Sequence, residues 1–243
     1  MKKSILFIFT ACFLFTTSCS DFLDEEHKTK YSSEYVFGTP EGLKLAVNAL
    51  YALQRYYAND TENATIFALE RGTDLAVTNG GTGNFYGIYD PNYLKPSASQ
   101  VGFMWRTMYQ IIGKANEIIA AAEDLEDTPS LRATVSEAKC FRAQSYFLLY
   151  RTFDRIWLNI QPTTAENVND PRDFHAASEK EVFDLIYEDL EYAITNLDWV
   201  SDEAGRFTQA AARHMKAKAA LWLKDWDTTL EPVSYTHLTL PTI

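Results

Sequence analysis

The chain has 243 residues, 47% of them hydrophobic and 14% aromatic, which is enough for one large domain or two small ones with a sizeable buried core. Its net charge of −11 excludes the basic surface that nucleic-acid binding requires, and it gives no electrostatic attraction to anionic lipid. The cysteines form no disulfide framework, and Cys140 is expected to be an unpaired, buried and inert residue.

Residues 1–18 have the pattern of a secretory signal peptide. Lys2 and Lys3 precede an apolar run over residues 5–15, and small residues follow directly before Cys19. The run is too short to span a bilayer core, which needs about 20 apolar residues. Cys19 stands where a bacterial lipoprotein signal places the thiol that receives a diacylglyceryl group, although Thr16 replaces the usual leucine of that motif. The alternative is an ordinary secreted protein in which Cys19 has no special role.

Lipidation at Cys19 predicts a mature protein that is anchored to a membrane, because more than one acyl chain gives stable anchoring. Removal of residues 1–18 takes away Lys2 and Lys3 and no acidic residue, which lowers the net charge from −11 to −13. The acidic cluster Asp21–Glu26 then belongs to a solvated tether predicted over residues 19–38. It resembles the acidic export signal of lipoproteins that reach the outer face of the outer membrane. A plain charged tether is the alternative.

A helix is predicted from residue 39 onward. Thr39 is an N-cap residue, Pro40 fits the first helical position, and Glu41 places an acid in the first turn. Apolar residues follow at helical spacing as far as Gln54. A second, short helical stretch is predicted over residues 61–69.

Residues 72–99 are predicted to form a long irregular loop, because they are rich in glycine, proline and asparagine. Loops of this length in compact proteins are often functional. An alternative role for the aromatic rings in this loop is to pack it onto the core. The candidate ligand-binding residues in the loop are Asn84, Phe85, Tyr86, Tyr89 and Tyr93.

From residue 101 onward the apolar spacing predicts helices almost throughout. One helix covers residues 101–122, and a second opens at Thr128-Pro129. A connector is predicted over residues 151–173; a capping box at Ser178–Glu181 then opens a third helix, and Thr208 caps a fourth. Small and aromatic residues at the expected contacts predict a mainly all-α fold of tetratricopeptide-like helical hairpins with long irregular loops.

Large side chains within these helices also have a predicted environment. Arg142 and Arg151 are expected to extend to solvent or to helix carbonyls. Packing in the core is expected for the tryptophans Trp105, Trp199, Trp222 and Trp226.

The sequence contains no evident catalytic or metal-binding constellation. The histidines are scattered, and neither a His-Glu-x-x-His nor a Cys-x-x-Cys spacing occurs, so we expect no zinc site. Gly80–Gly83 lacks the lysine of a phosphate-binding loop. Carboxylates are too abundant in this acidic chain to single out a glycosidase pair. We therefore expect no cofactor and no catalytic residue.

The last residues differ in character from the rest of the chain. Val233–Ile243 carries no charge, whereas charged residues make up 23% of the whole chain. Its back-translation resembles a transposon-type sequencing adaptor, so residues 232–243 are expected to be an artefact. A genuine β-prone tail is the alternative. If the tail is an artefact, residues 39–231 are an incomplete helical domain whose gene continues beyond Glu231.

Several segments, in this order along the chain, resemble the SusD/RagB-like family of outer-membrane lipoproteins from polysaccharide-uptake systems. They are CSDFLD at 19–24, FMWRTMYQIIGKAN at 103–116, EAKCFRAQSYF at 137–147, VFDLIYEDLEYA at 182–193 and GRFTQAAA at 205–212. In one place the chain departs from the family. The family has a Gly-Asp-Ile-Pro-like turn where this chain reads Asp154-Arg155-Ile156-Trp157, so the loop shape there is expected to differ.

The resemblance implies a binding protein and not an enzyme. SusD-like proteins lie as lids over a TonB-dependent, SusC-like transporter barrel and capture oligosaccharides at the cell surface. Their sugar contacts come from loops, because aromatic rings suit the apolar faces of pyranoses and amides bind the hydroxyls. Three alternatives stay open: a helical-repeat lipoprotein scaffold that binds only a protein partner, a peptide-capturing uptake protein of the same family, and a lipid-anchored glycoside hydrolase.

Overall fold

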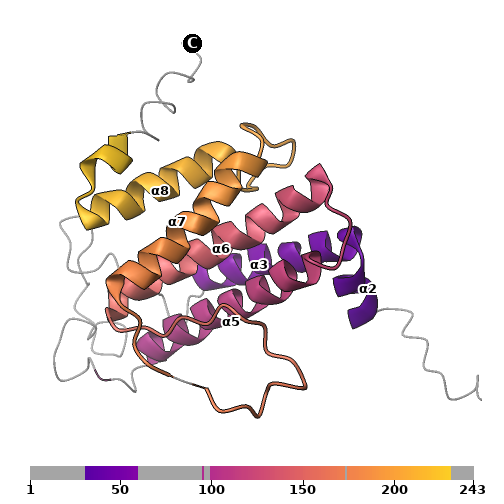
Figure 1. Cartoon of the computed structure of the whole chain (residues 1–243), viewed down its shortest axis with the longest axis horizontal. Coiled ribbons are helices and arrows are strands. Elements are labelled where there is room, and N and C mark those ends of the chain that lie inside the picture. Colours follow the sequence, from indigo (N-terminus) through magenta and orange to yellow (C-terminus); the bar gives the residue numbers. More distant parts are fainter. Residues whose placement is uncertain (1–30, 60–94, 96–98, 173, 231–243) are drawn as a thin grey trace, which may run out of the picture. The chain divides into compact units, whose positions relative to one another are not determined.

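The computed structural model describes residues 31–59, 95, 99–172 and 174–230, and its helices are labelled in Figure 1. Within these ranges the chain forms helices and no strand, which confirms the predicted all-α class. None of the described helices is long and apolar enough to cross a membrane. The helices are α2 (Ser33–Gly38), α3 (Pro40–Asn59), α5 (Ser99–Ala122), α6 (Pro129–Phe153), α7 (Glu179–Asn196) and α8 (Gln209–Leu223).

Helices that follow one another in the chain pack side by side. Helix α5 lies against α3 and α6, α6 lies against α7, and α7 lies against α8 (Figure 1). The pairs α5–α6 and α7–α8 are the predicted helical hairpins. Together the helices enclose a continuous apolar core, whose largest fully buried side chains include Tyr146, Phe141, Phe183, Leu43, Leu50 and Met108.

Hydrogen bonds at the helix starts confirm the predicted caps. At α7 the capping box is complete, because Ser178 N donates to Glu181 Oε2 at 2.8 Å and Glu181 N donates to Ser178 Oγ at 3.3 Å. Each such bond satisfies a backbone N–H that has no partner inside the helix. Side-chain caps of the same kind occur at Thr39, Thr128 and Thr208.

The segment predicted as a tether over residues 19–38 ends in a helix, α2, which turns directly into α3. The turn is so tight that a Cβ added to Gly42 would lie 2.1 Å from Tyr35 O and 2.6 Å from Val36 Cα. Thr39 Oγ1 also donates a hydrogen bond to Tyr35 O at 2.8 Å. The sequence pattern missed α2 because a helix of six residues is too short to show an apolar period.

Arg142 lies in the core, which corrects the prediction that it reaches solvent. Its side chain on α6 donates twice to Asp189 of α7, from Nε to Oδ2 and from Nη2 to Oδ1, both at 2.7 Å. Lys139 Nζ adds a third bond to Asp189 Oδ1 at 2.8 Å, and Asp189 is 0% exposed. Burial opposes the charge of Arg142, but the hydrogen bonds and negative charge of Asp189 outweigh it, so the pKa of the guanidinium is raised.

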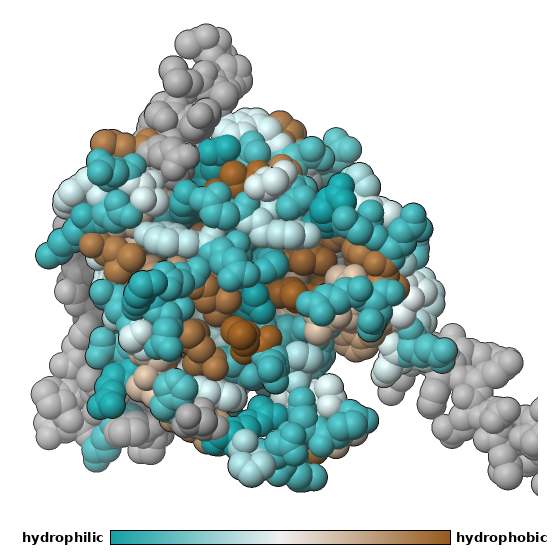
Figure 2. All heavy atoms as spheres, viewed as in Figure 1, coloured by the Kyte–Doolittle hydropathy of each residue, from teal (hydrophilic) through white to brown (hydrophobic). Residues whose placement is uncertain are grey.

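Three tryptophans lie at the edge of the core and not inside it, contrary to the prediction. Trp105, Trp222 and Trp226 are 36%, 46% and 59% exposed, and Trp199 is half-buried. Such large rings are rarely buried completely. Arg151 is exposed, as predicted, and its guanidinium lies 5.3 Å from the centre of the Trp222 ring. Figure 2 shows hydrophobic residues reaching the surface in separate places between hydrophilic side chains.

Cys140 is a free cysteine with 0% exposure, so its predicted burial is confirmed. Burial raises the pKa of its thiol far above the usual value, and the charges of Asp189 and Glu137 act in the same direction. A thiol in this state is not a nucleophile, because the reactive species is the thiolate.

Candidate ligand-binding site

The predicted site residues fall outside the described part of the chain, so they stay predictions. They are Asn84, Phe85, Tyr86, Tyr89 and Tyr93 of the loop, and the lipidation site Cys19. The described part contains a different candidate segment, which we call the connector: residues 154–172 and 174–178, between α6 and α7. The connector begins later than predicted, because α6 continues to Phe153.

The connector opens with a strained turn at Asp154. This residue has φ 63° and ψ −54°, and Arg155 N donates to Phe153 O at 2.6 Å. The bond closes a γ-turn of the rare, strained kind around Asp154. For a residue with a side chain such a conformation costs about 1–3 kcal/mol. Asp154 stands at the position that glycine usually occupies in the family's Gly-Asp-Ile-Pro-like turn. The backbone at Asp154 has a conformation that glycine adopts without strain.

We expect Asp154→Gly to raise the free energy of unfolding by about 1 kcal/mol, because glycine has no Cβ to clash at positive φ. Urea unfolding of the full chain measures the change. Asp170→Gly is the matched control in the same connector, since Asp170 is exposed and lacks a positive φ. The control should lose a few tenths of a kcal/mol, because glycine increases the entropy of the unfolded chain. Equal losses in both variants would contradict the strain at Asp154.

Two tyrosine hydroxyls hold the backbone of the connector against the helices. Tyr109 Oη donates to Trp157 O at 2.8 Å and accepts from Trp157 N at 3.0 Å. Tyr146 Oη makes the same pair of bonds with Asn159 O and N, both at 2.8 Å. Burial raises the pKa of both tyrosines above the usual value, so both hydroxyls keep their proton at neutral pH. Helices α5 and α6 therefore fix two alternate residues of the connector.

The buried charges of the core extend this anchoring. Arg142 Nη1 donates to Asn116 Oδ1 at 2.8 Å, which leaves the Asn116 amide nitrogen to donate to Asn159 O at 2.7 Å. Because Asp189 holds Arg142, the position of the connector depends on a hydrogen-bonded path from α7 through α6 and α5. Sequence reasoning missed this path, since its members lie far apart in the chain.

A row of aromatic rings runs from α5 onto the connector. The ring centres of Trp105 and Tyr109 lie 4.8 Å apart, and Tyr109 stacks on Trp157 at 6.4 Å with an interplanar angle of 25°. Trp157 then contacts Phe174 at 4.8 Å, and Phe174 is 69% exposed. The row therefore carries apolar ring surface from the core to solvent at the connector.

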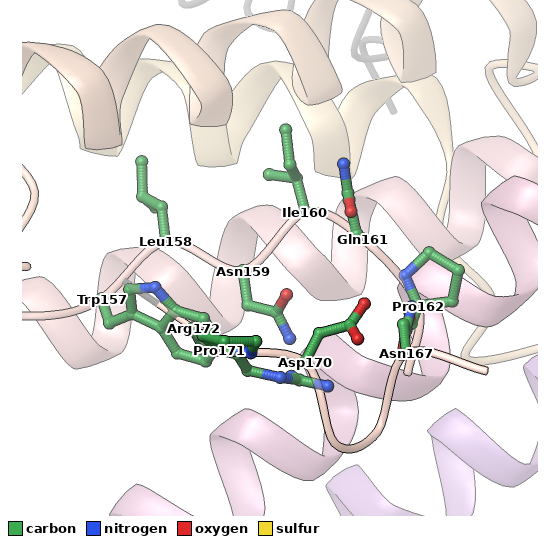
Figure 3. A pocket seen from close by; sticks show the side chains of 10 residues that line it. All are labelled: Trp157, Leu158, Asn159, Ile160, Gln161, Pro162, Asn167, Asp170, Pro171 and Arg172. Atoms are coloured by element: carbon green, nitrogen blue, oxygen red, sulfur yellow. The ribbon is translucent and has the colours of Figure 1, made fainter. Parts of the chain in front are cut away.

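The connector has a first limb, residues 157–162, and a second limb, residues 167–172. They flank an open hollow, which we call the connector hollow. Its volume is about 470 Å³, and residues 157–162, 167 and 170–172 line it. Figure 3 shows Trp157 and Asn159 on one side of the first limb, and Leu158 and Ile160 on the other. This alternation is the one expected of an extended segment.

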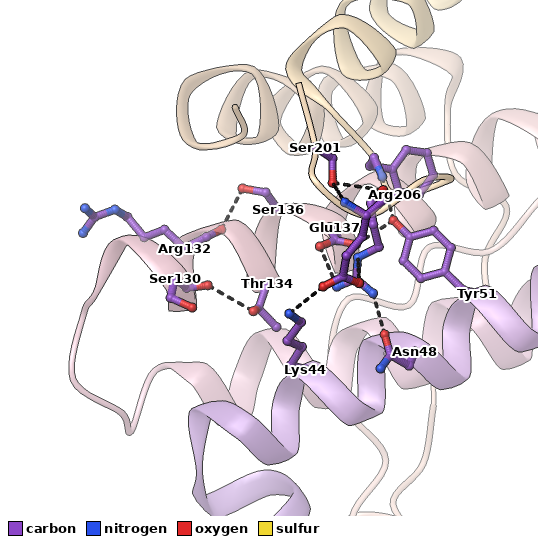
Figure 4. Close-up of polar contacts among 12 residues, drawn as sticks. Lys44, Asn48, Tyr51, Ser130, Arg132, Thr134, Ser136, Glu137, Ser201 and Arg206 are labelled. Atoms are coloured by element: carbon purple, nitrogen blue, oxygen red, sulfur yellow. Dashed lines mark hydrogen bonds and ion pairs between the residues drawn. The ribbon is translucent and has the colours of Figure 1, made fainter. Parts of the chain in front are cut away.

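A second polar cluster joins α3, α6 and the loop before α8 (Figure 4). Glu137 accepts from Tyr51 Oη at 2.5 Å and from Arg206 Nη2 at 3.0 Å, and Phe207 N donates to Tyr51 Oη at 2.7 Å. Burial raises the pKa of Glu137, although Tyr51 and Arg206 act in the opposite direction. Because these groups satisfy one another, the cluster acts as a structural clamp. Within the described ranges, no three His, Cys, Asp or Glu side chains are grouped so that they could hold a metal ion.

Fold and site together define an all-α protein of packed helical hairpins that presents rings and amides on a long connector. A family model described as "Starch-binding associating with outer membrane" matches residues 21–221, so the chain belongs to the SusD-like family. This finding confirms the resemblance seen in the sequence. The family comprises carbohydrate-binding proteins and not enzymes.

Individual relatives agree with this assignment. A SusD-like protein of Bacteroides ovatus is 28% identical over 93% of this chain and 40% of its own length. Among solved structures, a laminarin-binding SusD-like protein has a TM-score of 0.69 and 26% identity, over 79% of this chain and 42% of that one. A structure with xylogluco-oligosaccharide has a TM-score of 0.59 and 24% identity, over 74% of this chain and 34% of that one. The chain thus spans about two fifths of the curated relatives that it matches.

Proposed function

We propose that this protein captures oligosaccharides at the cell surface and delivers them to a TonB-dependent outer-membrane transporter. The observation that carries the proposal is the family match over residues 21–221. The 26% identity to a protein that binds laminarin supports a glycan as the ligand. The net charge of −11 agrees with a neutral ligand better than with a polyanionic one.

The N-terminal sequence and the family description support the proposed place of action. The family is described as associating with the outer membrane. Lipidation at Cys19 would supply the anchor, and the acidic residues that follow it favour exposure on the outer face. The SusC-like transporter is the proposed partner, since a capture protein needs a route by which its ligand crosses the membrane.

Other functions make different predictions in solution. A lipid-anchored hydrolase would release reducing ends from a polysaccharide, whereas a capture protein releases none. A scaffold that binds only protein would show no heat of binding with oligosaccharides from laminarin, xyloglucan or starch. A peptide-capturing protein would bind peptides in the same calorimetric titration. A reducing-sugar assay and isothermal titration of the full chain therefore separate these alternatives.

We expect Tyr86→Ala and Tyr89→Ala to weaken glycan binding by about 1 kcal/mol each, because each removes a ring that stacks on a pyranose. Isothermal titration calorimetry measures the loss, and an unchanged urea midpoint shows that folding is intact. Tyr31→Phe is the control, since Tyr31 lies outside this loop and the change keeps its ring. Unchanged affinity in both loop variants would leave these tyrosines with a packing role only.

A further inference from the structure

We propose that the connector hollow, which residues between α6 and α7 line, is a saccharide-binding subsite. Its volume of about 470 Å³ lies within the range of roughly 300–1,000 Å³ that is typical of ligand pockets. The choice of carbohydrate as the ligand rests on the proposed function. The choice of the site rests on the geometry of its rings and polar groups.

The first element of the subsite is the ring of Trp157. It is half-buried, it stacks on Tyr109 from one side, and it contacts the exposed ring of Phe174 at 4.8 Å. The hydroxyl of Tyr109 fixes the backbone N–H and C=O of Trp157. A ring held in this way offers its free surface to a pyranose at a small cost in conformational entropy.

The second element is a set of polar side chains that the protein itself does not use. In the described part of the chain, the amide of Asn159 and the carboxylate of Asp170 make no side-chain hydrogen bond, because the bonds of Asn159 all use its backbone. Figure 3 shows the Asn159 amide pointing toward the limb that carries Asp170. An amide both donates and accepts, and a carboxylate accepts, which matches the hydroxyl groups of a sugar.

The third element is the fixed shape of the second limb. Asn167 Oδ1 accepts from Thr164 N at 2.8 Å, and Asn167 Nδ2 donates to Pro162 O at 2.9 Å. Arg172 Nη2 donates to Thr163 Oγ1 at 3.1 Å, which ties the end of the second limb to the turn between the two limbs. The hollow is therefore formed before a ligand arrives, which favours binding.

The charges around the hollow favour a neutral sugar. Among the described residues that line it, Asp170 is the acidic residue and Arg172 is the basic one, so the formal charges of these two cancel. A uronate or sulfated sugar would place its charge beside Asp170, and a cationic ligand would meet Arg172. A neutral pyranose chain avoids both repulsions and uses the two groups as hydrogen-bond partners.

Isothermal titration of the full chain tests the subsite, with oligosaccharides from laminarin, xyloglucan and starch as probes. We expect Trp157→Ala to weaken binding roughly fivefold through loss of the stacking ring. Asn159→Ala should weaken binding by a similar factor. This substitution keeps the connector anchored, because Tyr146 and Asn116 bond only the backbone of residue 159. Trp226→Ala is the matched control, since Trp226 is 59% exposed and lies beyond α8.

The outcomes separate the subsite from the proposed function. Suppose that the wild type binds a probe and that neither Trp157→Ala nor Asn159→Ala weakens this binding by more than about twofold. That result would refute the proposed subsite but would leave the proposal of glycan capture intact. Equal weakening by Trp226→Ala would overturn the subsite as well. If the wild type binds none of the probes, both proposals fail. Should Trp157→Ala lower the urea midpoint, Asn159→Ala and Asp170→Asn decide the result.

Discussion

Asp189→Ala is expected to lower the free energy of unfolding by about 3–5 kcal/mol, because it leaves two buried cations without their partner. Asp189 is 0% exposed and accepts three charge-assisted hydrogen bonds from Lys139 and Arg142. Their side chains are only 10% and 6% exposed, so water cannot replace the lost carboxylate without opening the contact between α6 and α7. Urea unfolding of the full chain, followed by circular dichroism, measures the loss.

The matched control lies on the same helix. Asp184 pairs with Lys180 at 2.5 Å, but these side chains are 61% and 82% exposed. Asp184→Ala should therefore cost less than about 1 kcal/mol. Replacement of all three buried groups, as Lys139→Met, Arg142→Met and Asp189→Leu together, should recover much of the stability lost in Asp189→Ala. A loss of less than about 1 kcal/mol in Asp189→Ala would show that these charges are solvated in the folded protein.

Cys19→Ala is expected to abolish lipidation and to move the protein from the membrane pellet to the soluble fraction. The physical reason is that the acyl chains on Cys19 are the proposed membrane attachment, and the variant lacks the thiol that receives them. Labelled palmitate incorporation and ultracentrifugation of the full-length protein measure the two effects.

Cys140→Ala is the control for the anchor. Cys140 is buried, so its removal should leave both palmitate incorporation and pelleting unchanged. Protease added to intact cells should degrade the wild type if the anchored protein faces outward. Palmitate incorporation by Cys19→Ala at the level of the wild type would refute the anchor.

Apart from α2, the described helices were predictable from the sequence because their determinants are local. Caps such as Thr128, Ser178 and Thr208 lie next to the apolar periods that they begin. The environment of Arg142 was not predictable, because its partner Asp189 lies 47 residues away on another helix. A charged residue on an amphipathic helix is usually exposed, and only tertiary packing makes this one an exception.

The sequence likewise predicted one part of the candidate site and missed another. The aromatic loop was predicted from composition and lies almost wholly outside the described residues, so the site residues proposed in it stay predictions. The connector hollow was missed, because the prolines and the irregular mixture of polar and apolar residues over 151–173 give no recognisable binding motif in the sequence. Its shape comes from Tyr109 and Tyr146, whose helical spacing indicates core positions and gives no sign that their hydroxyls bind a distant backbone. Tyrosine at a core position with no nearby polar partner is a signal that could have pointed to such an anchor.

Affinity electrophoresis of the full chain tests glycan capture most directly. The protein migrates through native gels that contain laminarin, xyloglucan or starch, beside a gel without polysaccharide. We expect at least one polysaccharide to retard the wild type, because the family to which the chain belongs binds carbohydrate. Unchanged migration in all three, in gels that do retard a laminarin-binding SusD-like protein, would contradict the proposal that this protein captures glycans.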